Sequence, residues 1–201
     1  MVVSESIGLI LLAAGGSTRL GRPKQLLEYQ GQPLLRRAAV AALASRCRPV
    51  VVVLGAEAKR CAAVLKDLPV TIVLNPDWAM GMASSIRAGI LELEKSKTRI
   101  SAVILCVCDQ PLLAPAILDA LGEKYRQTGV KMAAAEYASQ PGVPALFDAS
   151  LFGRLKSLSG EEGARLLLRE NPRAVARVPF PGGERDVDTL DDFADLPGQD
   201  K

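Results

Sequence analysis

Five apolar runs, separated by segments with helical spacing, constrain the fold of this chain more than any other feature. The runs cover residues 7–13, 49–55, 70–74, 101–108 and 131–136. Between them, apolar residues recur at helical spacing over 33–45, 56–66, 84–96 and 115–127. Strands that are apolar on both faces are typical of a parallel sheet covered by helices on both sides, with right-handed crossovers. The pattern therefore predicts an α/β, Rossmann-like, doubly wound and mostly parallel sheet.

The alternation loosens after residue 136. The later segments are 140–147, 159–170, 174–180 and 185–193. They are predicted to form a small antiparallel C-terminal addition and terminal helices. Because the 201 residues contain no repeat, low-complexity tract or linker, we expect one domain spanning 1–201.

The absence of one residue type limits the possible chemistry. The chain has no histidine, which excludes Ser-His-Asp and Cys-His catalysis and any histidine-ligated metal. Its four cysteines form no C-x-x-C pair, and are expected to be small, reduced core residues.

A net charge of +3 is too small to argue for nucleic acid. No run is long enough to span a bilayer and no basic signal-peptide region is present, so we expect a cytoplasmic protein that binds no membrane.

The predicted fold indicates where a ligand would bind. In doubly wound sheets, ligands bind outside the carboxyl ends of the parallel strands. Three irregular segments follow such ends, at residues 13–24, 75–83 and 109–114.

The first of these segments reads LAAGGSTRLGRPK over residues 12–24. Its glycines at 15, 16 and 21 permit unusual backbone conformations and close ligand approach, and successive N–H groups can form an anion-binding nest. Arg19 and Lys24 add positive charge. The pattern is neither the P-loop nor the dinucleotide-binding fingerprint. A flexible turn with surface charges would also explain the glycines, but the added cations favour a phosphate site.

Carboxylates follow the fourth apolar run and recur near the C-terminus. Asp109 could hold a divalent cation at the end of its strand. It could instead cap the next helix, because Pro111 and Pro115 suit a helix start. Asp186 and Asp188 alternate on a predicted short strand and would share a face, where like charges need a cation or basic group between them. The choice between them as a second metal ligand stays open.

The segment NPDWAMGMASSIRAG, residues 75–89, is compatible with an ordinary loop and a capped helix. Gly81 permits close approach, and Ser84 or Ser85 could cap the helix. Trp78 would be either a lid or a loop anchor. Thr189 is predicted to cap a helix that begins near residue 190.

Together, these segments resemble the nucleotidyltransferase family that includes molybdenum cofactor cytidylyltransferase. The matching residues are Leu12, Ala13, Ala14, Gly15, Ser17, Arg19, Leu20, Gly21 and Lys24, then Asn75, Pro76, Trp78, Gly81 and Ser85, then Asp109, Gln110 and Pro111, and finally Gly142, Pro144, Gly160, Gly163, Arg165, Asp186, Asp188, Thr189 and Asp192. The matches run over nearly the whole chain. One departure is Cys108, where such proteins often have glycine.

The resemblance implies Mg²⁺-dependent transfer of CMP from CTP to the terminal phosphate of the molybdopterin cofactor, with release of pyrophosphate. It implies catalytic roles for Arg19, Lys24 and Asp109, and metal ligation by Asp109 and Asp188. The implied nucleotide-binding residues are Ala13, Ala14, Gly15, Gly16, Ser17, Arg19, Lys24, Gly81 and Ser85. A molybdoenzyme or its chaperone is an implied protein partner, and nucleic acid is not.

Two alternatives stay open at this stage. The same fold could transfer GMP or another nucleotidyl group to molybdopterin or to a different phosphorylated acceptor. A protein of another class could bind nucleotide and cofactor without turnover as an accessory to molybdoenzyme maturation. The retained Lys24 and Asp109 argue against the second alternative, and an assay of pyrophosphate release would decide it.

Overall fold

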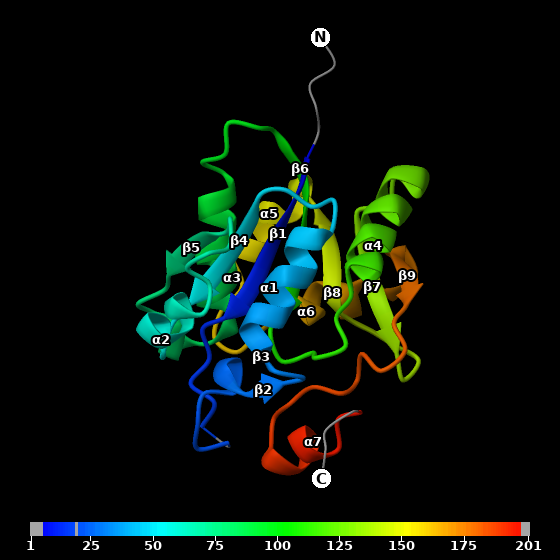
Figure 1. Ribbon diagram of the computed structural model, residues 1–201. Helices are drawn as coiled ribbons and strands as arrows, with labels where there is room; N and C mark the ends of the chain where they lie inside the picture. Colours follow the sequence, from blue (N-terminus) through cyan, green and yellow to red (C-terminus); the bar gives the residue numbers. More distant parts are fainter. Residues whose placement is uncertain (1–5, 19, 198–201) are drawn as a thin grey trace.

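The computed structural model describes residues 6–18 and 20–197, and its centre is one mostly parallel sheet (Figure 1). The strands are β1 (Ser6–Ala13), β4 (Val50–Leu54), β5 (Thr71–Leu74), β6 (Ile100–Val107), β7 (Met132–Tyr137), β8 (Gln140–Asp148) and β9 (Val175–Pro179). They lie in the order β5-β4-β1-β6-β8-β7-β9. Only β8 runs antiparallel to its neighbours β6 and β7. A separate small antiparallel pair joins β2 (Glu28–Tyr29) to β3 (Gln32–Pro33). The predicted fold class is therefore confirmed.

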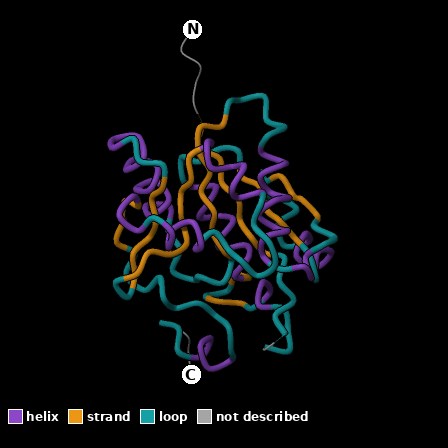
Figure 2. The backbone as a smooth tube through the Cα atoms, turned by 180° about the vertical axis from the view of Figure 1, so that it is seen from behind, coloured by secondary structure: helices purple, strands orange, loops and turns teal. Residues whose placement is uncertain are grey.

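Helices cover both faces of the sheet, as Figures 1 and 2 show from opposite sides. One face carries α1 (Leu34–Ala44), α2 (Ala58–Ala63) and α4 (Pro115–Thr128). The other carries α3 (Met82–Leu93), α5 (Phe152–Lys156) and α6 (Arg165–Glu170). The short α7 (Leu190–Ala194) lies near the C-terminus, and 3₁₀ turns occur at Lys24–Leu26, Trp78–Met80, Ala149–Leu151 and Pro172–Ala174.

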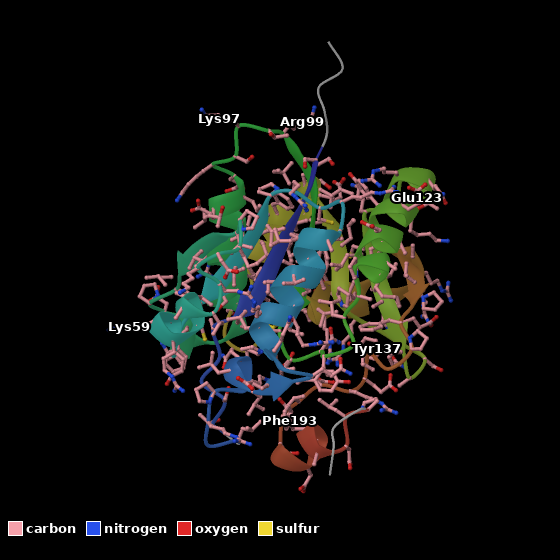
Figure 3. All side chains as sticks on the ribbon, viewed as in Figure 1. Lys59, Lys97, Arg99, Glu123, Tyr137 and Phe193 are labelled. Carbon is pink, nitrogen blue, oxygen red and sulfur yellow. The ribbon has the colours of Figure 1, made fainter. Side chains whose placement is uncertain are left out.

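The two faces of the sheet form two separate hydrophobic clusters. Successive strand residues point to opposite faces, so Leu9 and Leu11 pack with α1 while Ile10 packs with α3. Helices shield both faces of the sheet from water, which explains why these strands are uniformly apolar. Charged side chains such as Lys59, Lys97 and Glu123 instead extend outward at the periphery (Figure 3).

A third, smaller hydrophobic cluster attaches the C-terminal segment to the segment after the glycine-rich loop. Its buried residues are Leu20, Leu27, Tyr29, Leu34, Val187 and Leu196. The Tyr29 hydroxyl also donates a hydrogen bond of 2.6 Å to the Pro197 carbonyl oxygen. This packing places residues near 188 beside the carboxyl ends of the central strands.

Three expectations for local structure are wrong. The strand at 174–180 was expected in an antiparallel addition, but β9 pairs parallel with β7. Residues 185–188 form no strand; the Val187 N–H instead donates to the Asp109 carbonyl oxygen at 3.0 Å. The third helix begins at Met82, so Ser84 and Ser85 lie inside it and do not cap it.

The four cysteines are buried and unpaired, as expected: Cys47, Cys61, Cys106 and Cys108. Burial raises the pKa of each thiol, that of Cys61 to about 11. Protonated, buried thiols are poor nucleophiles. Within the described ranges, no helix has the length and apolar character needed to cross a membrane.

Candidate active site

A cavity of about 600 Å³ opens at the carboxyl ends of β1 and β6. All three segments predicted from the strand ends contribute to its wall, together with Asp188 of the C-terminal segment. Sequence reasoning did not single out Gln25 or Glu161, which also line it.

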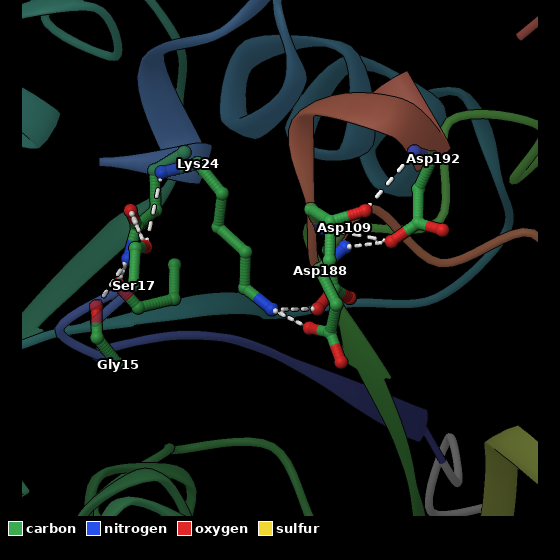
Figure 4. A network of polar contacts seen from close by, with 9 residues as sticks. Gly15, Ser17, Lys24, Asp109, Asp188 and Asp192 are labelled. Atoms are coloured by element: carbon green, nitrogen blue, oxygen red, sulfur yellow. Dashed lines mark hydrogen bonds and ion pairs between the residues drawn. The ribbon is translucent and has the colours of Figure 1, made fainter. Parts of the chain in front are cut away.

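Lys24 forms the centre of a charged group at this cavity. Its Nζ atom lies 2.5 Å from Asp109 Oδ2 and 3.0 Å from Asp188 Oδ1 (Figure 4). Burial by itself lowers the pKa of Lys24, but the charge of Asp109 and hydrogen bonds to Asp109 and Asp188 raise that pKa above its usual value. The ammonium group therefore stays protonated at neutral pH and neutralises carboxylates from two distant parts of the chain.

The other carboxylate oxygen of Asp109 is buried and has no hydrogen-bond partner among the described residues. An orphaned anionic oxygen is costly unless a ligand or ion satisfies it. The capping alternative for Asp109 is wrong, because α4 begins at Pro115 and its N-cap residue is Ala114. Asp109 instead faces the cavity.

Asp188, and not Asp186, lines the cavity and contacts Lys24. The capping box predicted in part at Thr189 is present: its hydroxyl accepts from the Asp192 N–H at 3.1 Å. One Asp192 carboxylate oxygen accepts from the N–H groups of Asp188 and Thr189, which fixes the backbone beside the site. Asp186 is exposed, although neighbouring atoms still screen its carboxyl from part of the water. That partial burial, with the charges of Asp109 and Asp188, raises the pKa of Asp186.

The donor set at this end of the sheet fits a divalent cation that is completed by substrate. Mg²⁺ is usually held by one or two carboxylates together with phosphates and water. Asp109 and Asp188 supply two carboxylates, and the buried Asp109 Oδ1 atom is not used by any described residue. No group of three or more potential ligands occurs in the described part of the chain. The residues could therefore hold a metal that also binds phosphate, but not enclose one alone.

The glycine-rich loop has a different conformation from the one its glycines suggest. Gly21 has a φ of +66°, but in the 15–18 stretch the left-handed residue is Ser17, at +52°. A Cβ atom on Gly16 would lie 3.2 Å from the Trp78 ring, so Gly16 allows that ring to pack against the loop. This contact favours the loop-anchor role for Trp78. Arg19 lies outside the described residues.

Gln25 forms hydrogen bonds that hold this loop in place, and the sequence analysis did not identify it. Its Nε2 donates to the carbonyl oxygens of Ala13 at 3.2 Å and Gly15 at 2.7 Å. Its Oε1 accepts from the Ser17 hydroxyl at 3.3 Å, and the Lys24 N–H donates to the same hydroxyl at 3.0 Å. The available signal was an uncharged polar residue directly after the predicted catalytic lysine and before two leucines.

The segment after β5 supplies a further part of the cavity wall. The Asn75 amide donates to the hydroxyls of Ser84 at 2.8 Å and Ser85 at 3.0 Å. Ser85 faces the cavity. Gly81 has a φ of +101°, and a Cβ atom there would meet the Gly160 carbonyl oxygen at 2.2 Å. Only glycine fits this turn, because a side chain there would collide with the Gly160 backbone.

Comparisons with known proteins match nearly the whole chain. The profile of the MobA-like NTP transferase domain matches residues 9–175. Nicotine blue oxidoreductase of Paenarthrobacter nicotinovorans is 36% identical over 192 residues, which cover 90% of this chain and 92% of that protein. Rv0371c of Mycobacterium tuberculosis H37Rv superposes with a TM-score of 0.81 at 29% identity, covering 94% of this chain and 96% of that chain. Its complex with manganese superposes with a TM-score of 0.78 at 27% identity and the same coverage.

A third solved structure shares the fold at lower identity. Molybdopterin-guanine dinucleotide biosynthesis protein A of Archaeoglobus fulgidus superposes with a TM-score of 0.68 at 16% identity, covering 94% of this chain and 95% of that chain. At that identity the likeness extends to the fold alone.

Proposed function

The chain belongs to the MobA-like NTP transferase family, and from that premise we propose that it is a cytidylyltransferase acting on the molybdopterin cofactor. CMP would move from CTP to the terminal phosphate of the cofactor, and pyrophosphate would leave. The observation that carries the proposal is the meeting of Lys24, Asp109 and Asp188 beside the loop of residues 15–18 in one cavity.

The reaction suits a site without histidine. The nucleophile is a phosphate monoester, which is largely dianionic at neutral pH because its second pKa is about 6. Its oxygen attacks the α-phosphorus of CTP, and the bond from that phosphorus to the β-phosphate oxygen breaks. No general base is required. The protein has to neutralise charge and align two anions.

Each part of the cavity has a role in this proposal. Loop N–H groups of residues 15–18, with Arg19, would bind the triphosphate, while Ala13 and Ala14 shape the wall. Lys24 would turn from the carboxylates toward the α-phosphate, while Gly81 and Ser85 would contact the base or ribose. Asp109 and Asp188 would hold Mg²⁺, which supplies further charge neutralisation when bound. We also propose that the whole chain acts as one domain, and that a molybdoenzyme or its chaperone receives the product.

The decisive experiment measures pyrophosphate release with each nucleoside triphosphate, with and without molybdopterin, in the presence of Mg²⁺. We expect release only with CTP and the cofactor together. Release with GTP in preference to CTP would replace the cytidylyl assignment by a guanylyl one. Absence of release with every triphosphate, while nucleotide still binds, would favour the accessory-protein alternative.

The relative named nicotine blue oxidoreductase raises a second candidate function, an oxidoreductase activity in place of nucleotidyl transfer. Its 36% identity over nearly the whole chain is the observation that favours it. The glycine-rich loop departs from the dinucleotide-binding fingerprint, which argues against a nicotinamide cofactor bound in that manner. Oxidation of NADH or NADPH with a dye acceptor tests it: sustained turnover by the purified protein would favour the reductase over the transferase.

A further inference from the structure

Gln25 is one of the most deeply buried polar residues of the molecule. Its exposed fraction is 1%, and it lies in the 3₁₀ turn Lys24–Leu26 below the glycine-rich loop. A buried amide group must be fully hydrogen-bonded to be tolerated. Both polar atoms of the Gln25 amide are bonded. The nitrogen donates to the carbonyl oxygens of Ala13, at the end of β1, and of Gly15 in the loop, and the oxygen accepts from the Ser17 hydroxyl.

These bonds determine which backbone groups face the cavity. In a planar trans peptide, the carbonyl and the N–H of the same unit point in opposite directions. The Gly15 carbonyl is drawn toward Gln25, so the N–H of Gly16 points away from it (Figure 4 shows Gly15 and Ser17). Among the described residues, the Gly16 N–H donates to no protein group, and Gly16 lines the cavity. A carbonyl oxygen in that place would repel a phosphate.

The same residue also helps to hold a strained conformation. Ser17 is left-handed, which is uncommon for a residue other than glycine and persists only where surrounding contacts enforce it. Three bonds enforce it here. The Ser17 hydroxyl donates to Gln25 and accepts from the Lys24 N–H, and the Ser17 carbonyl accepts from the Leu20 N–H at 3.1 Å. Through the Ser17 hydroxyl, Gln25 therefore links the loop to Lys24.

We propose that Gln25 is a positioning residue for the triphosphate. It turns loop carbonyls inward and so presents loop N–H groups to the anion. Gln25 acts through the backbone and makes no contact with the reacting atoms. This inference rests on the proposed function, because it assumes that the cavity binds a nucleoside triphosphate.

The test compares Gln25→Met, which keeps the side chain's length but removes its hydrogen bonds, with Gln25→Glu, which replaces the donor by a carboxylate. Ser45→Ala is the control, since Ser45 is also buried and hydrogen-bonded but lies at the end of α1, outside the cavity lining. Dissociation constants for CTP are measured by calorimetry and by fluorescence of Trp78, the sole tryptophan, which lines the cavity.

We expect Gln25→Met to weaken CTP binding by about 10- to 100-fold, the scale of losing one or two hydrogen bonds to a charged group. The KM for CTP should rise in parallel while the KM for the acceptor stays unchanged. Ser45→Ala should lower stability without changing the CTP dissociation constant. A purely structural role for Gln25 would give the same pattern as this control.

The pH profile of Gln25→Glu gives a second, independent readout. When ionised, its carboxylate faces the Ala13 and Gly15 carbonyl oxygens and adds negative charge below the triphosphate. When protonated, it regains one donor. Binding of CTP relative to wild type should therefore improve as the pH falls from about 8 to about 6, because burial raises carboxyl pKa values into this range. This profile decides the question even if Gln25→Met fails to fold.

The outcomes separate the two proposals. Wild-type protein that binds no nucleoside triphosphate would refute the proposed function itself. Wild-type protein that binds CTP while both Gln25 variants bind it equally well, with a flat pH profile, would overturn only the positioning role.

Discussion

Removal of the Lys24 ammonium should make the stability of the protein depend on divalent cations. Lys24→Met keeps most of the apolar stem but removes the ammonium group that lies between the like-charged carboxylates of Asp109 and Asp188. The side-chain exposed fractions are 20% for Lys24, 14% for Asp109 and 38% for Asp188. The substitution should lower the free energy of unfolding by about 1–3 kcal/mol. This lies between the fraction of a kcal/mol typical of exposed ion pairs and the roughly 3–5 kcal/mol lost when a buried pair is broken. For a chain of this size, 2 kcal/mol corresponds to about 4–8 °C in Tm.

A divalent cation should offset this loss in the variant more than in the wild type. In the wild type the metal competes with the Lys24 ammonium group for these two carboxylates, and in Lys24→Met that competition is removed. Saturation at 100 times the dissociation constant stabilises a protein by about 2.7 kcal/mol. The assay is thermal and urea unfolding in EDTA and across a Mg²⁺ titration. Lys95→Met is the matched control, because Lys95 pairs with Glu92 at the surface and should show no cation dependence.

The contribution of Lys24 to stability should depend on pH in a defined direction. Because the folded-state pKa of Lys24 is raised, its stabilisation is complete below the unfolded value of about 10.4 and is lost only as the pH rises through the higher folded value. The stability difference between wild type and Lys24→Met should not shrink between pH 7 and pH 9. Equal Mg²⁺ responses in the two proteins, or an undiminished Tm in EDTA, would refute the reasoning.

Four further predictions concern the same cavity. CTP with Mg²⁺ should raise the Tm more than GTP does at matched concentrations; a larger shift with GTP would contradict the cytidylyl assignment. Lys24→Ala should lower turnover by about 10²–10³-fold, the effect of removing one preorganised electrostatic group; near-normal turnover would place Lys24 outside the chemistry. Asp109→Asn should lower the Tm less than Lys24→Met does, because Asp188 still pairs with Lys24, but should give very low activity and a raised Mg²⁺ requirement; Asp188→Asn should act similarly but more weakly, as kinetic Mg²⁺ titrations would show. Asp186→Asn should keep normal activity and unfold no more easily at pH 7, because the raised folded-state pKa of Asp186 means that its ionised carboxylate destabilises the folded state relative to the unfolded state there.

The sequence determined the layers of the fold and the end of the sheet at which a ligand would bind. Uniformly apolar runs such as 49–55 need cover on both faces, and this requirement can be read locally from hydrophobic periodicity. Right-handed crossovers then place the loops after β1, β5 and β6 at one edge. The three segments predicted from this rule do line one cavity, with the C-terminal segment beside them.

Local patterns failed where pairing partners decide the structure. The direction of β9 depends on its neighbour β7, and nothing within residues 174–180 specifies that partner. Residues 185–188 alternate like a strand, but they pair with no strand, and the Val187 N–H bonds to the Asp109 carbonyl oxygen instead. The third helix begins at Met82 because Gly81 makes the turn before it, so the serines become wall residues.

The contacts of the candidate site were decided by tertiary structure alone. Lys24 lies 85 residues from Asp109 and 164 from Asp188 in the sequence, and the third hydrophobic cluster helps to bring the C-terminal segment to the first loop. The sequence could show that Gln25 is polar, but not that it is buried below the loop. An anion in the cavity meets either N–H or carbonyl groups, depending on the orientation of the peptide units. Hydrogen bonds between distant segments set that orientation, and these bonds cannot be read from the local sequence.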